Sequence, residues 1–237
     1  MTDRRCVVLL PGLLCDEAVW AEQVTALSSA RCVVPSYGEC GSLEAMARGV
    51  LAGVDADRFA LAGHSMGGRV ALEMLRQAPG RIERLALLDT GIEPLPAGAP
   101  GEQERERRFA LLGLARERGM RSMGAAWARG MVHPSRLDAP LFERILDMIE
   151  RRTPAVFEAQ IQALLARPDA RAVLQAARCP TLVACGRQDA WSPLERHEQM
   201  HALCAGSRLV VFEDCGHMST MEQPAAVSRA LLAWLDA

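Results

Sequence analysis

The sequence predicts an α/β protein in which a doubly wound, essentially parallel six-stranded sheet carries an inserted all-helical segment. Short, almost wholly apolar runs alternate with longer helical patterns, as they do when helices cover both faces of a parallel sheet. This alternation stops after position 93 and resumes only after Pro168. We therefore expect a core formed by residues 1–93 and 169–237, with a helical lid at residues 94–168.

Four strands are expected in the first part of the core. The apolar runs predict them at Cys6 to Leu10, Cys32 to Pro35, Phe59 to Ala62 and Leu85 to Leu88. Helical patterns follow the first three, at Ala18 to Leu27, Leu43 to Val54 and Gly67 to Gln77. Ser42 lies directly before the second of these helices, so we expect its hydroxyl to cap the free N–H groups of the first turn.

The expected lid begins with a linker rich in proline and glycine at residues 94–101. The pattern then predicts helices at Glu102 to Arg118, ended by Gly119, at Arg121 to Met131, at Pro140 to Arg152 and at Pro154 to Arg167. In the expected lid, apolar residues at spacings of three and four form one helical stripe: Met120, Met123, Trp127 and Met131. Such a stripe is usually core, but a lid also roofs a pocket, so Met123, Trp127 and Met131 are candidate substrate contacts.

The core resumes beyond Pro168. A strand is predicted at Thr181 to Cys185, a helix at Leu194 to Cys204, a strand at Arg208 to Phe212 and a closing helix at Ala225 to Leu235.

Composition restricts the class of protein. The 237 residues carry a net charge of −2 with no basic stripe, so we expect neither a nucleic acid nor a membrane as partner. All 27 basic residues are arginine, which excludes lysine-based Schiff-base and pyridoxal chemistry. The 8 cysteines form no C-x-x-C pair, and no apolar run is long enough to span a membrane. We therefore expect a cytoplasmic protein with buried cysteines and no metal or cofactor, with a homodimer as the candidate assembly.

The chemistry is expected to centre on Gly63-His64-Ser65-Met66-Gly67. This G-x-S-x-G pentapeptide follows a predicted strand and precedes a predicted helix, a setting that forces a sharp turn and exposes the serine hydroxyl. Only residues without Cβ let strand and helix approach so closely, which explains the glycines. An ordinary strand-to-helix turn is the alternative, but this setting favours Ser65 as a nucleophile.

A serine nucleophile needs a histidine to take its proton and an acid to orient that histidine. Asp189 and His217 follow the last two predicted strands, and parallel strands bring such loops to the same sheet edge as Ser65. Asp89 also follows a strand and is the alternative acid, whereas Asp214 is more typical of a residue that holds the loop. We favour Asp189 because the order Ser65, Asp189, His217 is the one expected of this arrangement.

Over nearly its whole length the chain resembles the α/β-hydrolases, in particular small esterase-like members with a lid. The matching motifs are Leu10-Pro11-Gly12-Leu13, Gly63-His64-Ser65-Met66-Gly67-Gly68, Gly186-Arg187-Gln188-Asp189 with Pro193, and Gly216-His217 with Glu222-Gln223-Pro224. The resemblance implies that the backbone N–H groups of Leu13 and Met66 form an oxyanion hole. This chain has Pro11 where the family commonly has histidine, which leaves the backbone donor in place.

The resemblance implies a serine hydrolase that cleaves a small-molecule ester, a carboxylesterase, through an acyl-enzyme on Ser65. A first alternative is a lyase or C–C hydrolase acting on an acidic substrate, because Gly-x-Ser-x-Gly-Gly-Arg resembles the elbow of menaquinone-pathway lyases. In that case Arg69 would contact a substrate carboxylate, although a structural salt bridge is the interpretation we favour for Arg69. A second alternative is a ligand-binding member of the fold without catalytic activity.

Several other reactive residues have simpler interpretations. His64 is expected to be packed or hydrogen-bonded, and Cys15 and Cys215 to be packed beside the active-site loops. His133 is a candidate pocket residue of the lid. His197 and His201 lie one helical turn apart without a third metal ligand, so we expect a surface pair.

Overall fold

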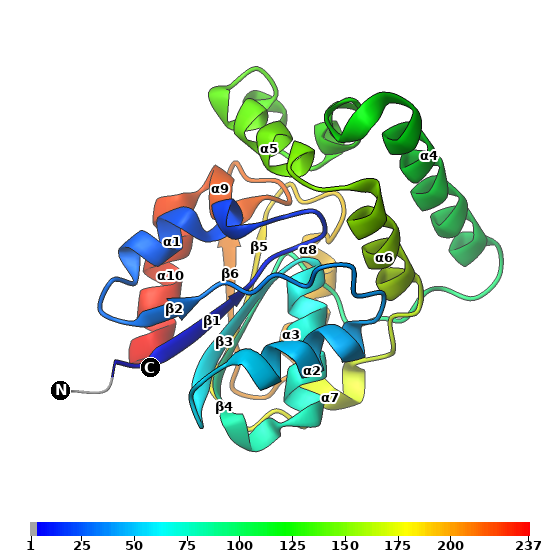
Figure 1. Cartoon of the computed structure of the whole chain (residues 1–237). Coiled ribbons are helices and arrows are strands. Elements are labelled where there is room, and N and C mark those ends of the chain that lie inside the picture. Colours follow the sequence, from blue (N-terminus) through cyan, green and yellow to red (C-terminus); the bar gives the residue numbers. More distant parts are fainter. Residues whose placement is uncertain (1–3) are drawn as a thin grey trace.

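One six-stranded sheet with every pairing parallel organises the chain, as the sequence predicts. The computed structural model describes residues 4–237 (Figure 1). The strands lie in the order β2-β1-β3-β4-β5-β6. Their bounds are β1 (Cys6–Leu10), β2 (Arg31–Val33), β3 (Phe59–His64), β4 (Ile82–Leu88), β5 (Thr181–Gly186) and β6 (Arg208–Phe212).

The strand order creates a switch point between β1 and β3. From β1 the chain runs outward to β2, then crosses back to add β3 on the other side of β1. The crossover connections therefore diverge at the carboxyl ends of β1 and β3, where Leu10 lies beside Gly63. In open parallel sheets this crevice is where ligands bind.

Helices cover both faces of this sheet, with α1 and α10 on one face and α2 and α3 on the other (Figure 1). Their bounds are α1 (Ala21–Ala26), α2 (Leu43–Gly53), α3 (Met66–Gln77), α7 (Arg171–Gln175), α8 (Leu194–Leu203), α9 (Ser219–Glu222) and α10 (Pro224–Asp236). The Ser42 hydroxyl accepts from the Ala45 N–H at 3.3 Å, as expected of the N-cap of α2. The short helices α7 and α9 were not predicted, because four or five residues carry too little periodicity.

Burial differs between central and edge strands. All residues of β1 and β3 are buried, since both strands are covered by helices and paired on both sides. The edge strands β2 and β6 are mostly half-buried. This explains why the central strands are almost wholly apolar in sequence.

Residues 94–168 form a helical insertion that contains no strand. It consists of α4 (Ala99–Trp127), α5 (Pro140–Glu150) and α6 (Pro154–Leu165), with short 3-10 turns at Ala128–Gly130 and Pro134–Arg136. Gly119 has φ 84° and ψ 161°, so it breaks α4 in two where the sequence predicts a break. The insertion lies beyond the carboxyl ends of the strands (Figure 1), and its role as a lid stays a prediction.

Candidate active site

Ser65 lies in the sharp turn between β3 and α3. Its φ of 54° and ψ of −117° are strained for a residue with a side chain. Two hydrogen bonds hold this backbone: Ser65 N–H donates to the Leu88 carbonyl at 2.9 Å, and the Thr90 hydroxyl donates to the Ser65 carbonyl at 2.7 Å. The strained turn is therefore fixed by the end of β4 and by the loop that follows it.

The glycines of the pentapeptide are required by close backbone contacts. A Cβ on Gly63 would lie 2.4 Å from the Gly67 carbonyl oxygen, and a Cβ on Gly67 would lie 2.2 Å from the Leu10 carbonyl oxygen. No side chain fits at such distances, so α3 packs directly against the ends of β1 and β3.

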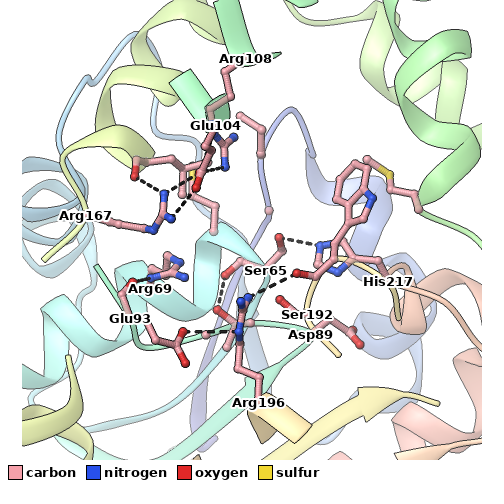
Figure 2. Close-up of a pocket in the computed structure, with 18 of the residues that line it drawn as sticks. Ser65, Arg69, Asp89, Glu93, Glu104, Arg108, Arg167, Ser192, Arg196 and His217 are labelled. Atoms are coloured by element: carbon pink, nitrogen blue, oxygen red, sulfur yellow. Dashed lines mark hydrogen bonds and ion pairs between the residues drawn. The ribbon is translucent and has the colours of Figure 1, made fainter. Parts of the chain in front are cut away.

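Three side chains form a continuous hydrogen-bonded chain. Ser65 Oγ lies 2.8 Å from His217 Nε2, and His217 Nδ1 lies 2.8 Å from Asp189 Oδ2 (Figure 2). Because an ionised carboxylate only accepts, His217 Nδ1–H donates to Asp189, which leaves Nε2 to accept from the Ser65 hydroxyl. The structure thus brings together the residues predicted as nucleophile, base and orienting acid.

The charges of Asp189 and His217 support each other. Burial alone would lower the pKa of His217, but the charge and hydrogen bond of Asp189 outweigh it and raise that pKa above its ordinary value. Burial alone would raise the pKa of Asp189, but His217 and the N–H groups of Ser192 and Trp191 lower it. Asp189 is therefore ionised at neutral pH beside a histidine of increased basicity.

Asp89, the alternative acid, has a different role. It is fully buried, accepts from the Gly186 N–H at 3.0 Å and bonds to the Ser219 hydroxyl. Burial and the nearby charge of Asp189 raise its pKa well above its ordinary value. Asp89, directly after β4, is thus joined to the last residue of β5 and to the first residue of α9, and it makes no hydrogen bond to His217 within the described chain.

The two expected oxyanion donors are free to act. Leu13 and Met66 both line the cavity beside Ser65. Among residues 4–237, neither of their backbone N–H groups donates to a protein acceptor. Two unpaired N–H groups beside a serine hydroxyl are the arrangement that stabilises a negatively charged oxygen.

The buried carboxylate of Glu222 joins the helical insertion to the loop of His217. Its Oε1 accepts from the N–H groups of Gly216 and Met218 at 3.1 Å each, and its Oε2 accepts from the His133 N–H at 2.7 Å. In addition, His217 N–H donates to the Met131 carbonyl at 2.6 Å. The backbone of His217 is therefore held by the insertion as well as by the core.

A cavity of about 920 Å³ opens at Ser65 between the core and the insertion. Aromatic rings form one side: Trp191 lies 5.2 Å from the His217 ring and 5.0 Å from Trp127, measured between centroids. Trp127 and Met131 line the cavity, as expected. Met123 does not line the cavity, so the prediction that it contacts substrate is wrong. Its side chain is completely buried in the interior of the insertion.

Arg69 lines the cavity without a salt bridge, which corrects the interpretation we favoured. Its Nη1 donates to the Glu93 backbone carbonyl at 2.9 Å. No carboxylate of the described residues lies within ion-pair distance of it. Burial, and then the charge of Arg167, lower the pKa of Arg69 to about 9, so the guanidinium remains protonated at neutral pH.

The remaining histidines are mostly structural. His64 is buried and bonds to the His217 carbonyl at 2.8 Å, in agreement with its expected packing. His197 is not a surface residue, which corrects the expected surface pair: it is buried and accepts from the Thr90 N–H at 3.1 Å, whereas His201 bonds to Ser207 at the surface. His133 is bonded to Ser135 outside the cavity.

Cys15 and Cys215 are buried, as expected of packed thiols. Burial raises the pKa of Cys15 to about 12 and that of Cys215 well above its ordinary value, so both thiols are protonated at neutral pH. Within residues 4–237, no cluster of three or more His, Cys, Asp or Glu residues has the arrangement of a metal site. No helix in the same range is long and apolar enough to cross a membrane.

Several residues of the cavity were not predicted from the sequence. Glu104 and Arg108, one turn apart on α4, meet Arg167 there, which follows α6 (Figure 2). In sequence these charges resemble a solvated helix face, and only the fold brings Arg167 to the other two. Trp191 could have been predicted as a cavity residue, since it lies two residues from Asp189 on the same loop.

The fold and this site define a hydrolase of the α/β class, and comparison with known proteins agrees. The sequence pattern described as the alpha/beta hydrolase family matches residues 7–230, so the chain belongs to that family.

Among individual proteins, the chain is 29% identical over 206 residues to 2-hydroxy-6-oxononadienedioate/2-hydroxy-6-oxononatrienedioate hydrolase 1 of Pseudomonas putida, covering 85% of this chain and 72% of that protein. It is 29% identical over 231 residues to the pimeloyl-[acyl-carrier protein] methyl ester esterase of Nitrosomonas europaea, covering 92% and 90%. A thermophilic esterase from Thermogutta terrifontis, solved with malate bound, superimposes with a TM-score of 0.88 at 30% identity and covers 98% of this chain and 89% of that one.

Proposed function

We propose that this hydrolase cleaves carboxylic esters of small molecules through an acyl-enzyme on Ser65. The observation that carries the proposal is the chain of 2.8 Å contacts from Ser65 Oγ through His217 to Asp189. A serine at the elbow favours acyl transfer, and the esterases among the relatives support the same class of reaction.

The reaction follows from these contacts. His217 Nε2 takes the Ser65 proton while Ser65 Oγ bonds to the ester carbon, and the negative carbonyl oxygen is held by the N–H groups of Leu13 and Met66. The carbon–oxygen bond to the alcohol then breaks as His217 gives its proton to the departing oxygen. Water attacks the acyl-enzyme, His217 takes its proton, and that proton returns to Ser65 when the acid leaves.

A fluorophosphonate probe and the Ser65→Ala variant test this proposal. We expect the probe to label Ser65 in the wild-type protein and Ser65→Ala to lose both labelling and ester turnover. A panel of p-nitrophenyl esters of increasing chain length measures the turnover. Turnover that survives in Ser65→Ala, or a failure to label Ser65, would contradict the proposed nucleophile.

A second candidate function is cleavage of an acidic substrate by a C–C hydrolase or lyase, with Arg69 as a carboxylate contact. The unpaired guanidinium of Arg69 favours it, as does the Pseudomonas putida relative, whose name specifies a dienedioate, a dicarboxylate. Uniform inactivity on simple esters, combined with turnover of such an acid, would favour this candidate over the first.

A further inference from the structure

The side of the cavity near His217 is apolar. In ester hydrolysis, His217 Nε2 must give a proton to the departing oxygen, so the leaving group lies within hydrogen-bond reach of that nitrogen. The Trp191 ring lies tilted against the His217 ring, the Trp127 ring lies tilted against Trp191, and Met131 lines the same cavity. The leaving group therefore meets aromatic and thioether surface.

The opposite side of Ser65 is cationic. In Figure 2, Arg69 and Arg167 lie on one side of Ser65 and His217 lies on the other. The cavity as a whole is lined by more arginines than glutamates, namely Arg69, Arg107, Arg108, Arg167 and Arg196 against Glu93, Glu104 and Glu195. Because the acyl group extends away from the leaving group, it points toward this cationic side.

Most of these arginines already have a carboxylate partner. Glu104 accepts from Arg167 at 2.7 and 2.8 Å and from Arg108 at 2.8 and 3.0 Å. Glu93 Oε2 lies 3.4 Å from Arg196 Nε. These pairs hold the cavity wall, and their charges are largely compensated.

Two of the five arginines, Arg69 and Arg107, lack such a partner, and Arg69 is the more buried of the two, since Arg107 is exposed. The one protein hydrogen bond of Arg69 within the described residues goes to a neutral backbone carbonyl. It is held on α3, one helical turn after Ser65, so its position relative to the reacting carbon is fixed by a rigid element. The charges of Glu93 and Glu104 act on Arg69 from beyond ion-pair distance. A largely buried guanidinium without a hydrogen-bonded carboxylate binds one favourably, because both charges are then held as a hydrogen-bonded pair.

We infer that the substrate carries its carboxylate at the far end of the acyl chain and an apolar leaving group, as in the monoester of a dicarboxylic acid. The inference rests on the proposed ester hydrolysis. The free carboxylate binds Arg69, the ester carbon lies at Ser65, and the alcohol part packs on Trp191 and Trp127. The acid released is then a dicarboxylate.

Three chromogenic esters of equal acyl length test whether the carboxylate lies on the acyl chain or on the leaving group. Mono-4-nitrophenyl adipate has a carboxylate on the acyl side, 4-nitrophenyl hexanoate has none, and the hexanoyl ester of 4-hydroxy-3-nitrobenzoate has it on the leaving group. We expect the Arg69→Met variant to reduce the ratio of kcat/KM for adipate to kcat/KM for hexanoate by roughly 10- to 100-fold, the range for a hydrogen bond to a charged group. Arg69→Lys should restore part of that ratio.

Arg48→Ala is the matched control. Arg48 is an exposed arginine on α2 that pairs with Glu44 away from the cavity, so its removal should leave all three rates unchanged. A ratio that Arg69→Met does not alter, or a wild-type preference for the carboxylate on the leaving group, would overturn the inference.

Direct binding separates this inference from the proposed reaction. Quenching of tryptophan fluorescence by adipate and by hexanoate is measured for the wild-type protein and for Arg69→Met. We expect adipate to bind more tightly than hexanoate to the wild-type protein and to lose that advantage in Arg69→Met. If hexanoate esters are turned over but adipate has no binding advantage, only the inference fails. If no ester is turned over, the proposed function fails, and binding alone decides whether Arg69 is a carboxylate site.

Discussion

Replacement of Asp189 by asparagine should reduce kcat by about 10⁴-fold through the tautomer of His217. Asp189 Oδ1 accepts from the N–H groups of Trp191 and Ser192, both at 2.9 Å. The carbonyl oxygen of asparagine would keep these two bonds, which turns its NH2 group toward His217 Nδ1. Nδ1 must then accept, so the proton moves to Nε2, and that nitrogen can no longer take the proton of Ser65.

The pH dependence provides a second measurement of the same change. His217 must be neutral to act as a base, so kcat/KM falls as pH drops below its pKa. Asp189 raises that pKa, so the acidic limb of the wild-type profile should lie above the ordinary histidine value of about 6.5. In Asp189→Asn the limb should move to lower pH, while thermal unfolding verifies that the variant is folded.

Asp89→Asn is the matched comparison. Asp89 is equally buried but bonds to Gly186 and Ser219, so its replacement should cost stability and less than about tenfold in kcat. If Asp189→Asn retained kcat within tenfold while Asp89→Asn lost activity, the orienting acid would be Asp89 and our assignment would be wrong.

The remaining predictions concern stability. Gly67→Ala would place a Cβ 2.2 Å from the Leu10 carbonyl oxygen and should lower the free energy of unfolding in urea by about 3 kcal/mol or more. A Cβ at Gly49 on α2 would meet no atom within 4 Å, so Gly49→Ala should raise the free energy of unfolding by about 0.5–1 kcal/mol. Equal effects of the two would contradict the close packing of α3 on β1. Burial alone would raise the pKa of Glu104, but the hydrogen bonds and charges of Arg167 and Arg108 outweigh it and lower that pKa to about 2. The ion pairs of Glu104 therefore contribute stability above pH 4.5 that is lost as pH falls toward 2. Glu104→Gln should therefore lower stability near pH 7 by about 2 kcal/mol and should flatten the acid-side decrease. A Glu104→Gln curve parallel to that of the wild-type protein would show that these pairs contribute nothing.

The sheet was predictable because its strands are buried on both faces. Central strands such as β3 are continuous apolar runs, and the turn after them is restricted by glycines whose steric role is visible in the sequence. The serine, aspartate and histidine could be placed because parallel strands bring the loops at their carboxyl ends to one edge. The order of strands and loops along the sequence was therefore enough to predict this part of the site.

Side-chain contacts between distant segments were not predictable. Whether Arg69 finds a carboxylate depends on where Glu93 and Glu104 lie, and these residues belong to a loop and to the insertion. His197 likewise has the neighbours of a surface histidine in sequence, yet Thr90 meets it in the interior. Met123 shares its helical stripe with Trp127, and only the packing of α4 on α5 decides which of them reaches the cavity.

The carboxylate of Glu222 limits how such an enzyme can be re-engineered. Exchange of residues 94–168 for the equivalent segment of a relative would bring in foreign backbone at Met131 and His133, which bond to His217 and Glu222. A chimera with exchange points at the ends of the insertion would thus disturb the general base while changing the cavity wall. If residues 131–133 of this chain are retained, and α4 is exchanged separately from α5 and α6, the hydrogen bonds that hold the backbone of His217 are kept. Substrate specificity could then be changed one segment at a time while the reaction chemistry is preserved.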